Sequence, residues 1–294
     1  MRWRVVLLPL IAVALCAQVE PPHRSGPVTI ATNAQLAPLL RSLAAAFEHS
    51  DGGSPLVIAV VGSDVAMARL TTGTADAAII ERPAYDPEAK AYEWVYRRPP
   101  TPRVLFSGSA FTAGKAPDLA FRVNSDNPLK VITLDQIRRA FAQTDSALTW
   151  RALGVQGALA DQRVRLDVPD TESGTGRFLR AAALDGQVQL PWNRVAEFAP
   201  VRFDDDGYTA RIAAAVARDC AALGVGDAAP MAGTRVLAIM VEGKALLPGD
   251  TGYPLARSIV AYGDSAPRPA VSAFFRFLET PAASTMIADA GYRP

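Results

Sequence analysis

Three short turns in the sequence place a hydroxyl side chain between an apolar, strand-like run and a helix-like segment. They are Ala31-Thr32-Asn33, Gly62-Ser63-Asp64 and Glu172-Ser173-Gly174-Thr175. A hydroxyl at such a place is a common helix N-cap, and the first turn of a helix presents unpaired N–H groups with a partial positive charge. One such turn is most often only a cap. Three at the carboxyl ends of parallel strands predict an anion site, because open α/β sheets bind ligands along that edge.

A carboxylate is expected at the same edge of the sheet. Glu81 follows an apolar run at 77–80 and begins the turn Glu81-Arg82-Pro83. A carboxylate repels an anion unless the ligand carries a proton that it can donate to the carboxylate. Hydrogen phosphate has such a proton at neutral pH and sulfate does not, so Glu81 favours a protonated oxyanion. The alternative interpretation is a solvent-exposed ion pair between Glu81 and Arg82.

The elements that would position these turns alternate between strands and helices. Apolar periodicity predicts strands at 28–31, 56–61 and 77–80, with helices at 34–49 and 64–72 between them. This order is typical of a parallel sheet with helices on its faces.

The remainder of the chain continues the α/β pattern. Further strands are expected within 92–112 and at 119–123, 164–168, 236–241 and 258–262, and helices at 134–142, 174–184, 208–222, 270–279 and 282–290. A chain of 294 residues is long enough for two domains. Two α/β units with more than one crossing between them form a two-lobed protein with a ligand cleft.

The N-terminus has the features of an export signal. Arg2 and Arg4 precede an apolar run that is too short to span a bilayer comfortably. We expect 1–17 to be a cleaved signal peptide and 18–26 a linker, which predicts a periplasmic protein. Cys16 raises the alternative of a lipoprotein, but Leu15 occupies a position where lipid-attachment signals have a small side chain.

Composition and cysteine usage exclude several classes of protein. Half of the residues are apolar and the net charge is +1, so the chain has a core and no global charge that favours nucleic acid. After cleavage only Cys220 remains, which excludes an intrachain disulfide, and its helix-like surroundings predict a packed core thiol. The two histidines and the acidic run 204–206 do not form a zinc site, a catalytic triad or a calcium loop, so no metal or cofactor is expected.

Several motifs in order resemble those of the periplasmic phosphate-binding proteins of ABC transporters, which have the type II solute-binding fold. They are Gly62-Ser63 with Gly73-Thr74-Ala75-Asp76, Glu81-Arg82-Pro83, Asn127-Pro128-Leu129, Glu172-Ser173-Gly174-Thr175 and Tyr253-Pro254-Leu255-Ala256-Arg257. The resemblance spans essentially all of the chain after the signal. It implies two α/β lobes, each a mostly parallel sheet flanked by helices, with a ligand cleft between them. We expect lobe I to comprise 27–118 with 252–294, and lobe II to comprise 119–251.

The resemblance also implies which residues contact the ligand. They are Thr32, Asn33, Ser63, Glu81, Ser173, Gly174 and Thr175. The family often has Asp where this chain has Glu81. Its best-known members carry an Arg four residues before the Ser of Ser-Gly-Thr, where this chain has Pro169. A bidentate Arg neutralises a bound oxyanion. Arg177 is therefore the first choice for a compensating cation, with Arg82 and Arg165 as alternatives.

Functions from different classes remain open at this point. The first is a monomeric, non-enzymatic binding protein that closes two lobes over inorganic phosphate and delivers it to an ABC permease in the inner membrane. The second is an exported phosphate-ester hydrolase with Ser63 or Ser173 as the nucleophile, which needs a base or metal that the sequence does not supply. The third, prompted by Pro169, is a family member that binds another oxyanion or acts as a sensor. None of them has a nucleic-acid partner.

Overall fold

The computed structural model describes residues 27–50, 53–112, 114–142, 148–186, 193–199, 207–263 and 267–294. The expected signal peptide and linker, and the acidic run 204–206, lie outside the described residues. Among the described helices, none combines the length and the apolar character that crossing a membrane requires.

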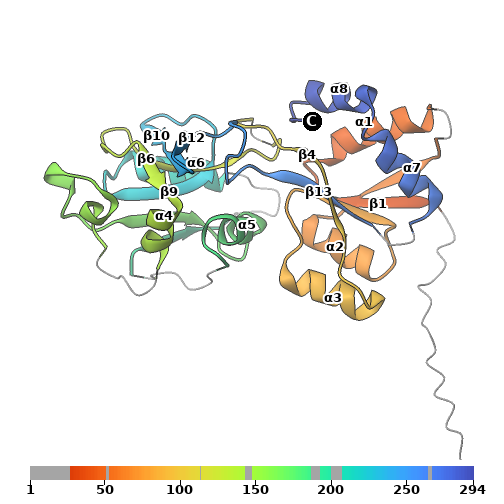
Figure 1. Cartoon of the computed structure of the whole chain (residues 1–294), viewed down its shortest axis with the longest axis horizontal. Helices are drawn as coiled ribbons and strands as arrows, with labels where there is room; N and C mark the ends of the chain where they lie inside the picture. The colour runs from red at the N-terminus through yellow and green to blue at the C-terminus, as the bar shows by residue number, and fades with distance from the viewer. Residues whose placement is uncertain are drawn as a thin grey trace, which may run out of the picture.

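The chain forms two lobes that lie side by side (Figure 1). Lobe I contains a five-stranded sheet with the strand order β2-β1-β3-β13-β4. Its strands are β1 (Val28–Thr32), β2 (Leu56–Val60), β3 (Ala77–Ile80), β4 (Pro102–Ser107) and β13 (Ser258–Gly263). β1 pairs in parallel with β2 and β3, whereas β13 is antiparallel to both β3 and β4.

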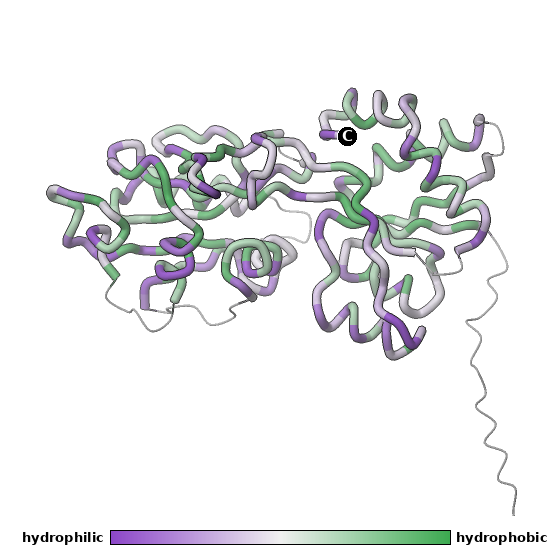
Figure 2. Tube along the Cα trace, viewed as in Figure 1, coloured by the Kyte–Doolittle hydropathy of each residue, from purple (hydrophilic) through white to green (hydrophobic). Residues whose placement is uncertain are grey.

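Helices cover both faces of the lobe I sheet. One face carries α1 (Ala37–Glu48), α7 (Pro269–Phe277) and α8 (Pro281–Asp289), and the other carries α2 (Ser63–Thr71) and α3 (Asp86–Tyr96) (Figure 1). In α1, Leu36, Leu40, Leu43 and Phe47 recur at helical spacing and are buried, so one stripe of the helix packs on the sheet. Hydrophobic residues follow the strands of this sheet, and polar residues mark the outer helices such as α3 (Figure 2).

Lobe II contains a second five-stranded sheet, with the order β10-β5-β9-β7-β8, and a small sheet, β12-β11-β6. Its strands are β5 (Leu119–Asn124), β6 (Val131–Thr133), β7 (Arg165–Pro169), β8 (Val195–Phe198), β9 (Ala222–Asp227), β10 (Thr234–Val236), β11 (Ala238–Val241) and β12 (Lys244–Leu246). Its helices are α4 (Leu134–Phe141), α5 (Gly174–Ala183) and α6 (Tyr208–Ala217), with short 3₁₀ turns η1 (Trp150–Leu153) and η2 (Gly157–Leu159). The α/β class and the two-lobed architecture are confirmed, and both five-stranded sheets are mixed, with parallel and antiparallel pairs.

Two connections cross between the lobes, from β4 to β5 and from β12 to β13. Asp118 joins these two connecting segments. Its buried carboxylate accepts hydrogen bonds from the amides of Gly249 and Arg257, at 3.0 and 3.3 Å, and forms an ion pair with Arg293. The amide of Gly108 also donates to the carbonyl of Arg257 at 2.8 Å. The crossing segments are therefore fastened to each other and to the C-terminus.

Two expected elements differ in the structure because helix signals were misread. The strands expected from residue 92 are wrong at their start, since α3 runs to Tyr96 and only β4 follows. The N-cap Tyr85 and Glu88 form a capping box, which starts α3. The helix expected at 208–222 ends at Ala217.

The strand β9 begins at Ala222, after a short turn, and was not predicted. Its glycines are required by packing, because a Cβ on Gly224 would lie 2.5 Å from Val216 Cγ2 of α6. The core thiol expected at Cys220 is also wrong: Cys220 lies in the turn between α6 and β9 and is exposed. The strand expected at 236–241 divides at Leu237 into β10 and β11, which belong to different sheets.

Candidate functional site

The carboxyl ends of β1, β2 and β3 meet at one edge of lobe I, where Thr32 is in register with Val60 and Ile79. Thr32 is completely buried, and its Oγ1 donates to the carbonyl oxygen of Ile79 at 2.7 Å. The helix caps expected at Thr32 and Ser63 are wrong. α1 has Leu36 at its N-cap, and α2 has Gly62, with Ser63 as its first residue. Thr32 instead fastens neighbouring strands together.

Asn33 and Ser63 are brought into contact at this edge. The Asn33 side-chain amide donates to Ser63 Oγ at 3.4 Å, and its Oδ1 accepts from the amide of Leu36 at 2.9 Å. The amides of Val61 and Gly62 both donate to the carbonyl of Thr32, which folds the turn before α2 tightly against β1. Gly62 has φ of 86°, a conformation that favours glycine.

Glu81 and Arg82 follow β3 and are both buried, with 7% and 4% of their surface exposed. Arg82 binds both carboxylate oxygens of Glu88 at 2.8 Å and Asp64 Oδ1 at 2.6 Å. Its guanidinium also lies 3.9 Å from the centre of the Tyr85 ring. Burial of Glu81 contradicts the interpretation that Glu81 and Arg82 form a solvent-exposed pair.

In lobe II, Ser173 is the N-cap of α5, as predicted. Its Oγ accepts from the amide of Gly176 at 3.1 Å and donates to the carbonyl of Asp170 at 2.5 Å. The turn requires Gly176, since a Cβ there would lie 2.3 Å from the carbonyl oxygen of Asp170. The amides of Gly174 and Thr175 lie in the first turn of α5, which is the part of a helix that presents N–H groups to an anion.

The start of α5 meets lobe I. An ideal Cβ on Gly174 would lie 3.9 Å from Arg82 Nε. Arg177, also in the first turn of α5, lies 3.6 Å from Asp64 and 4.4 Å from the centre of the Tyr85 ring, and it pairs with Glu172 at 3.2 Å. The two lobes therefore touch where the predicted anion-binding amides of α5 begin. Arg165, by contrast, starts β7 at the other end of the strand and pairs with Asp167 and Asp219.

A second cluster surrounds Thr175. Its Oγ1 is 2.9 Å from the Tyr208 hydroxyl and accepts from Arg257 Nη2 at 3.0 Å. The same Nη2 lies 3.5 Å from Asp227 Oδ1. Tyr208 begins α6, Asp227 ends β9, and Arg257 precedes β13, so three distant segments converge on one threonine that the sequence singled out.

The pKa values of charged groups at the site are shifted in the directions that these contacts predict. Burial alone lowers the pKa of Arg257, but Tyr208 and the carboxylates of Asp227 and Glu81 raise it above the ordinary value. Burial raises the pKa of Asp64, and the opposing hydrogen bonds from Tyr85 and Arg82 bring it below the ordinary value. The site therefore holds fixed positive charges beside fixed carboxylates.

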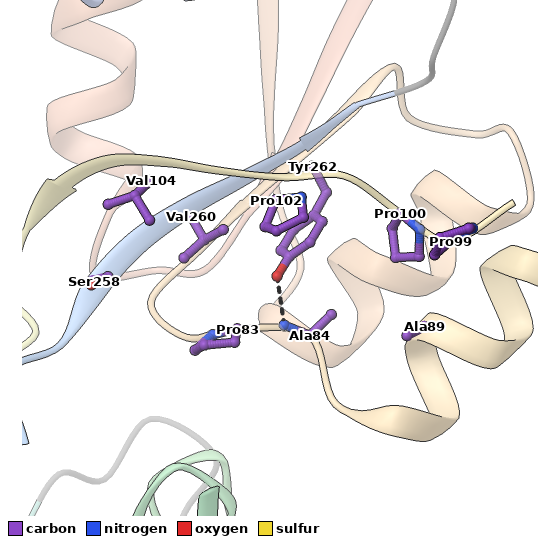
Figure 3. Close-up of a pocket in the computed structure, with 10 residues that line it drawn as sticks. All are labelled: Pro83, Ala84, Ala89, Pro99, Pro100, Pro102, Val104, Ser258, Val260 and Tyr262. Atoms are coloured by element: carbon purple, nitrogen blue, oxygen red, sulfur yellow. Dashed lines mark hydrogen bonds between the residues drawn. The ribbon is translucent and has the colours of Figure 1, made fainter. Parts of the chain in front are cut away.

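A separate pocket of about 390 Å³ lies on lobe I between α3, β4 and β13 (Figure 3). Prolines, valines and Tyr262 line it, and the Tyr262 hydroxyl accepts from the amide of Ala84 at 2.8 Å. It includes none of the predicted ligand residues. No group of three or more His, Cys, Asp or Glu side chains suited to a metal ion occurs in the part of the chain that the structure describes.

Two α/β lobes joined by two crossings, with oriented amides where they meet, define the class of two-lobed binding proteins. The chain belongs to the PBP superfamily, whose domain matches residues 17–281. It is 27% identical over 256 residues to the phosphate-binding protein PstS of Pseudomonas aeruginosa, covering 81% of this chain and 73% of that protein.

Solved structures show the same fold. An ABC-type phosphate transport receptor from Vibrio cholerae matches with a TM-score of 0.63 and 19% identity, over 91% of this chain and 99% of that one. PstS from Borrelia burgdorferi matches with a TM-score of 0.60 and 12% identity, over 92% and 98% of the two chains.

Sequence reasoning did not assign a role to Arg257, Asp227 or Tyr208. Arg257 belongs to the Tyr-Pro-Leu-Ala-Arg segment. That segment was part of the family resemblance, but none of its residues was expected to contact the ligand. Asp227 ends an apolar run that was not recognised as a strand. An acidic residue at the carboxyl end of such a strand is the signal that identifies Asp227 as a candidate.

Proposed function

We propose that this protein is an exported binding protein that captures inorganic phosphate between its two lobes. The observation that carries the proposal is the contact of the α5 N-terminus with lobe I beside the buried Glu81 and Arg82. Amides of Gly174 and Thr175 would hold the phosphate oxygens, with Ser173 fixing the turn. Asn33 and Ser63 would contribute contacts from lobe I.

Glu81 gives the proposed site its preference for a protonated ligand. A buried carboxylate accepts a hydrogen bond from hydrogen phosphate but repels sulfate, which has no proton to donate. Thr32 supports the site by fixing the end of β1 rather than by capping a helix. Arg177 would hold the two lobes together through its contacts with Asp64 and Tyr85, and its positive charge would also attract the bound anion.

The transport role follows from the proposed ligand and the fold. We propose that the lobes, divided at 118/119 and 251/252, close over phosphate and present it to an ABC permease in the inner membrane. The strand order supports this division, because β1 to β4 share one sheet with β13. The phosphate-binding relative and the N-terminal features of the sequence support a periplasmic location for the protein.

The hydrolase alternative has less support. The Ser63 hydroxyl contacts an amide, and the Ser173 hydroxyl contacts the backbone. Neither partner acts as a general base at neutral pH. Turnover of a chromogenic phosphate ester that is lost in Ser63→Ala or Ser173→Ala would favour this alternative instead.

Thermal unfolding of the mature protein tests the proposed function. Phosphate at a hundredfold excess over its dissociation constant stabilises the folded state by roughly 2.7 kcal/mol and raises the melting temperature. Sulfate at the same concentration and ionic strength gives a much smaller rise. No rise with phosphate contradicts the proposed function.

A further inference from the structure

We propose that Arg257 is the cation that binds the phosphate in this chain. This inference rests on the proposed function and names a further ligand-binding residue for it. It depends on where the crossing segment before β13 brings the guanidinium.

The position of Arg257 lies between the two halves of the site. β13 is antiparallel to β3, with Val260 opposite Ile80, so the start of β13 lies beside the residues that follow β3. Glu81 is one of those residues, and its carboxylate acts electrostatically on Arg257. On the other side, Arg257 Nη2 reaches Thr175 Oγ1 in the first turn of α5 at 3.0 Å. The guanidinium thus connects the carboxylate of lobe I with the anion-binding turn of lobe II.

Burial and donor geometry suit Arg257 to an anion. The residue is 9% exposed, and its Nε is buried without a hydrogen-bond partner among the described residues. Its contacts with Thr175 and Asp227 both use Nη2, and the guanidinium also forms a hydrogen bond with the Tyr208 side chain. A guanidinium presents five N–H donors in a planar fork, so one nitrogen can be held by the protein while others bind an oxyanion.

Charge balance requires such a cation. A phosphate dianion beside the carboxylates of Glu81 and Asp227 meets strong repulsion in a buried site unless a positive charge offsets it. Arg82 is engaged by Glu88 and Asp64, and Arg177 by Glu172 and Asp64. Arg257 has Asp227 at the longer distance of 3.5 Å, and Asp227 is placed to orient the guanidinium rather than to neutralise it fully.

The main alternative is that Arg257 only balances the buried charge of Asp227. Two variants separate these roles by calorimetric titration with inorganic phosphate: Arg257→Gln, and the double variant Arg257→Gln with Asp227→Asn. The double variant removes both charges and leaves no unpaired carboxylate. If Arg257 binds the anion, both variants lose about tenfold or more in phosphate affinity, the loss expected for one charged hydrogen bond. If the double variant binds phosphate as the wild type does, the proposal is overturned.

A conservative variant keeps the test decisive if the neutral variants do not fold. Arg257→Lys retains the charge but not the planar fork, so its phosphate affinity falls by several fold. Wild-type affinity in a folded Arg257→Lys protein also overturns the proposal. The matched control is Arg151→Gln, which removes an exposed Arg paired with the exposed Asp161 and leaves phosphate affinity unchanged. If the wild type itself binds no phosphate, the proposed function fails, whereas wild-type binding that survives in the Arg257 variants refutes only the role of Arg257.

Discussion

In the proposed site, Glu81 is the residue that we expect to discriminate between anions. It is buried at the end of β3, close enough to Arg257 for its carboxylate to raise the pKa of that guanidinium. A carboxylate in this position can accept a hydrogen bond from hydrogen phosphate and repels a fully deprotonated anion. Under this proposal, one side chain separates two tetrahedral anions of nearly the same shape.

The variant Glu81→Gln tests this role. Because Gln both donates and accepts, sulfate is no longer repelled, and the ratio of phosphate to sulfate affinity falls by about tenfold or more. Competition titrations of the two anions measure the ratio. Glu279→Gln is the control, since Glu279 is exposed and pairs with Arg103. An unchanged ratio in Glu81→Gln would remove Glu81 from the ligand site.

Sequence reasoning identifies residues whose role is local and misses those placed by tertiary contacts. Ser173 was predicted as an N-cap because its partner, Gly176, is three residues away. Thr32 was assigned to a helix cap, yet its partner is Ile79 on another strand. Arg257 received no role because its contact with Thr175 joins residues 82 positions apart. Spacing along the chain carries no signal for such a contact.

At the scale of elements, α2 and α5 make one of the contacts between the lobes. Asp64 in the first turn of α2 pairs with Arg82 of its own lobe and Arg177 of the other. Two guanidinium groups also lie against the ring of Tyr85. Guanidinium–ring contacts add to the ion pairs, so this small cluster ties the first turn of α5 to lobe I.

The pKa of Asp64 predicts how this contact responds to acid. Burial raises this pKa, but hydrogen bonds from Tyr85 and Arg82 lower it below the ordinary 3.8. A lowered carboxyl pKa contributes stability above the unfolded value, and the contribution is lost as pH falls through the folded value. Asp64→Asn is therefore less stable than the wild type at about pH 6, and this difference in stability shrinks as pH falls below the ordinary value of 3.8. Urea unfolding across this range measures it.

The control for this prediction is Asp161→Asn, because Asp161 forms an exposed pair with Arg151 within lobe II. The difference in stability between Asp161→Asn and the wild type is smaller at every pH, since pairs in which both side chains are exposed contribute little to the free energy of unfolding. A gap for Asp64→Asn that persists undiminished at the acid end would show that Asp64 acts through packing rather than charge.

Elements themselves were predictable where one periodicity dominated. The alternation from β1 to β3 followed from apolar runs separated by amphipathic helices, although the edge strand β2 is only partly buried. The strand β9 was not predicted because its glycines interrupt the apolar pattern. These glycines are present because α6 packs closely against the strand. The division of 236–241 at Leu237 was also not predicted. Only the strands with which they pair determine that β10 and β11 belong to different sheets.

At the scale of the whole molecule, Asp118 fastens the two crossings between the lobes. Its carboxylate is completely buried and joins Gly249 and Arg257 of the second crossing with Arg293 at the C-terminus. The two crossings are thus joined by a buried ionic contact rather than being free connections.

Removing this carboxylate destabilises the fold. Asp118→Ala leaves Arg293 without its partner and two amides without an acceptor, which costs about 3 kcal/mol in the free energy of unfolding. Chemical denaturation measures the loss. Asp126→Ala, at an exposed position in the same lobe as β5, stays within about 0.5 kcal/mol of the wild type. If Asp118→Ala is as stable as this control, Asp118 does not hold the two connecting segments together.

The most direct test of the account is a calorimetric titration of the mature protein with phosphate, arsenate and sulfate at neutral pH. Phosphate and arsenate both carry a proton that they can donate in a hydrogen bond, so the account predicts that each binds once per chain and that sulfate binds far more weakly. Equal binding of all three anions, or no heat from any of them, would contradict it.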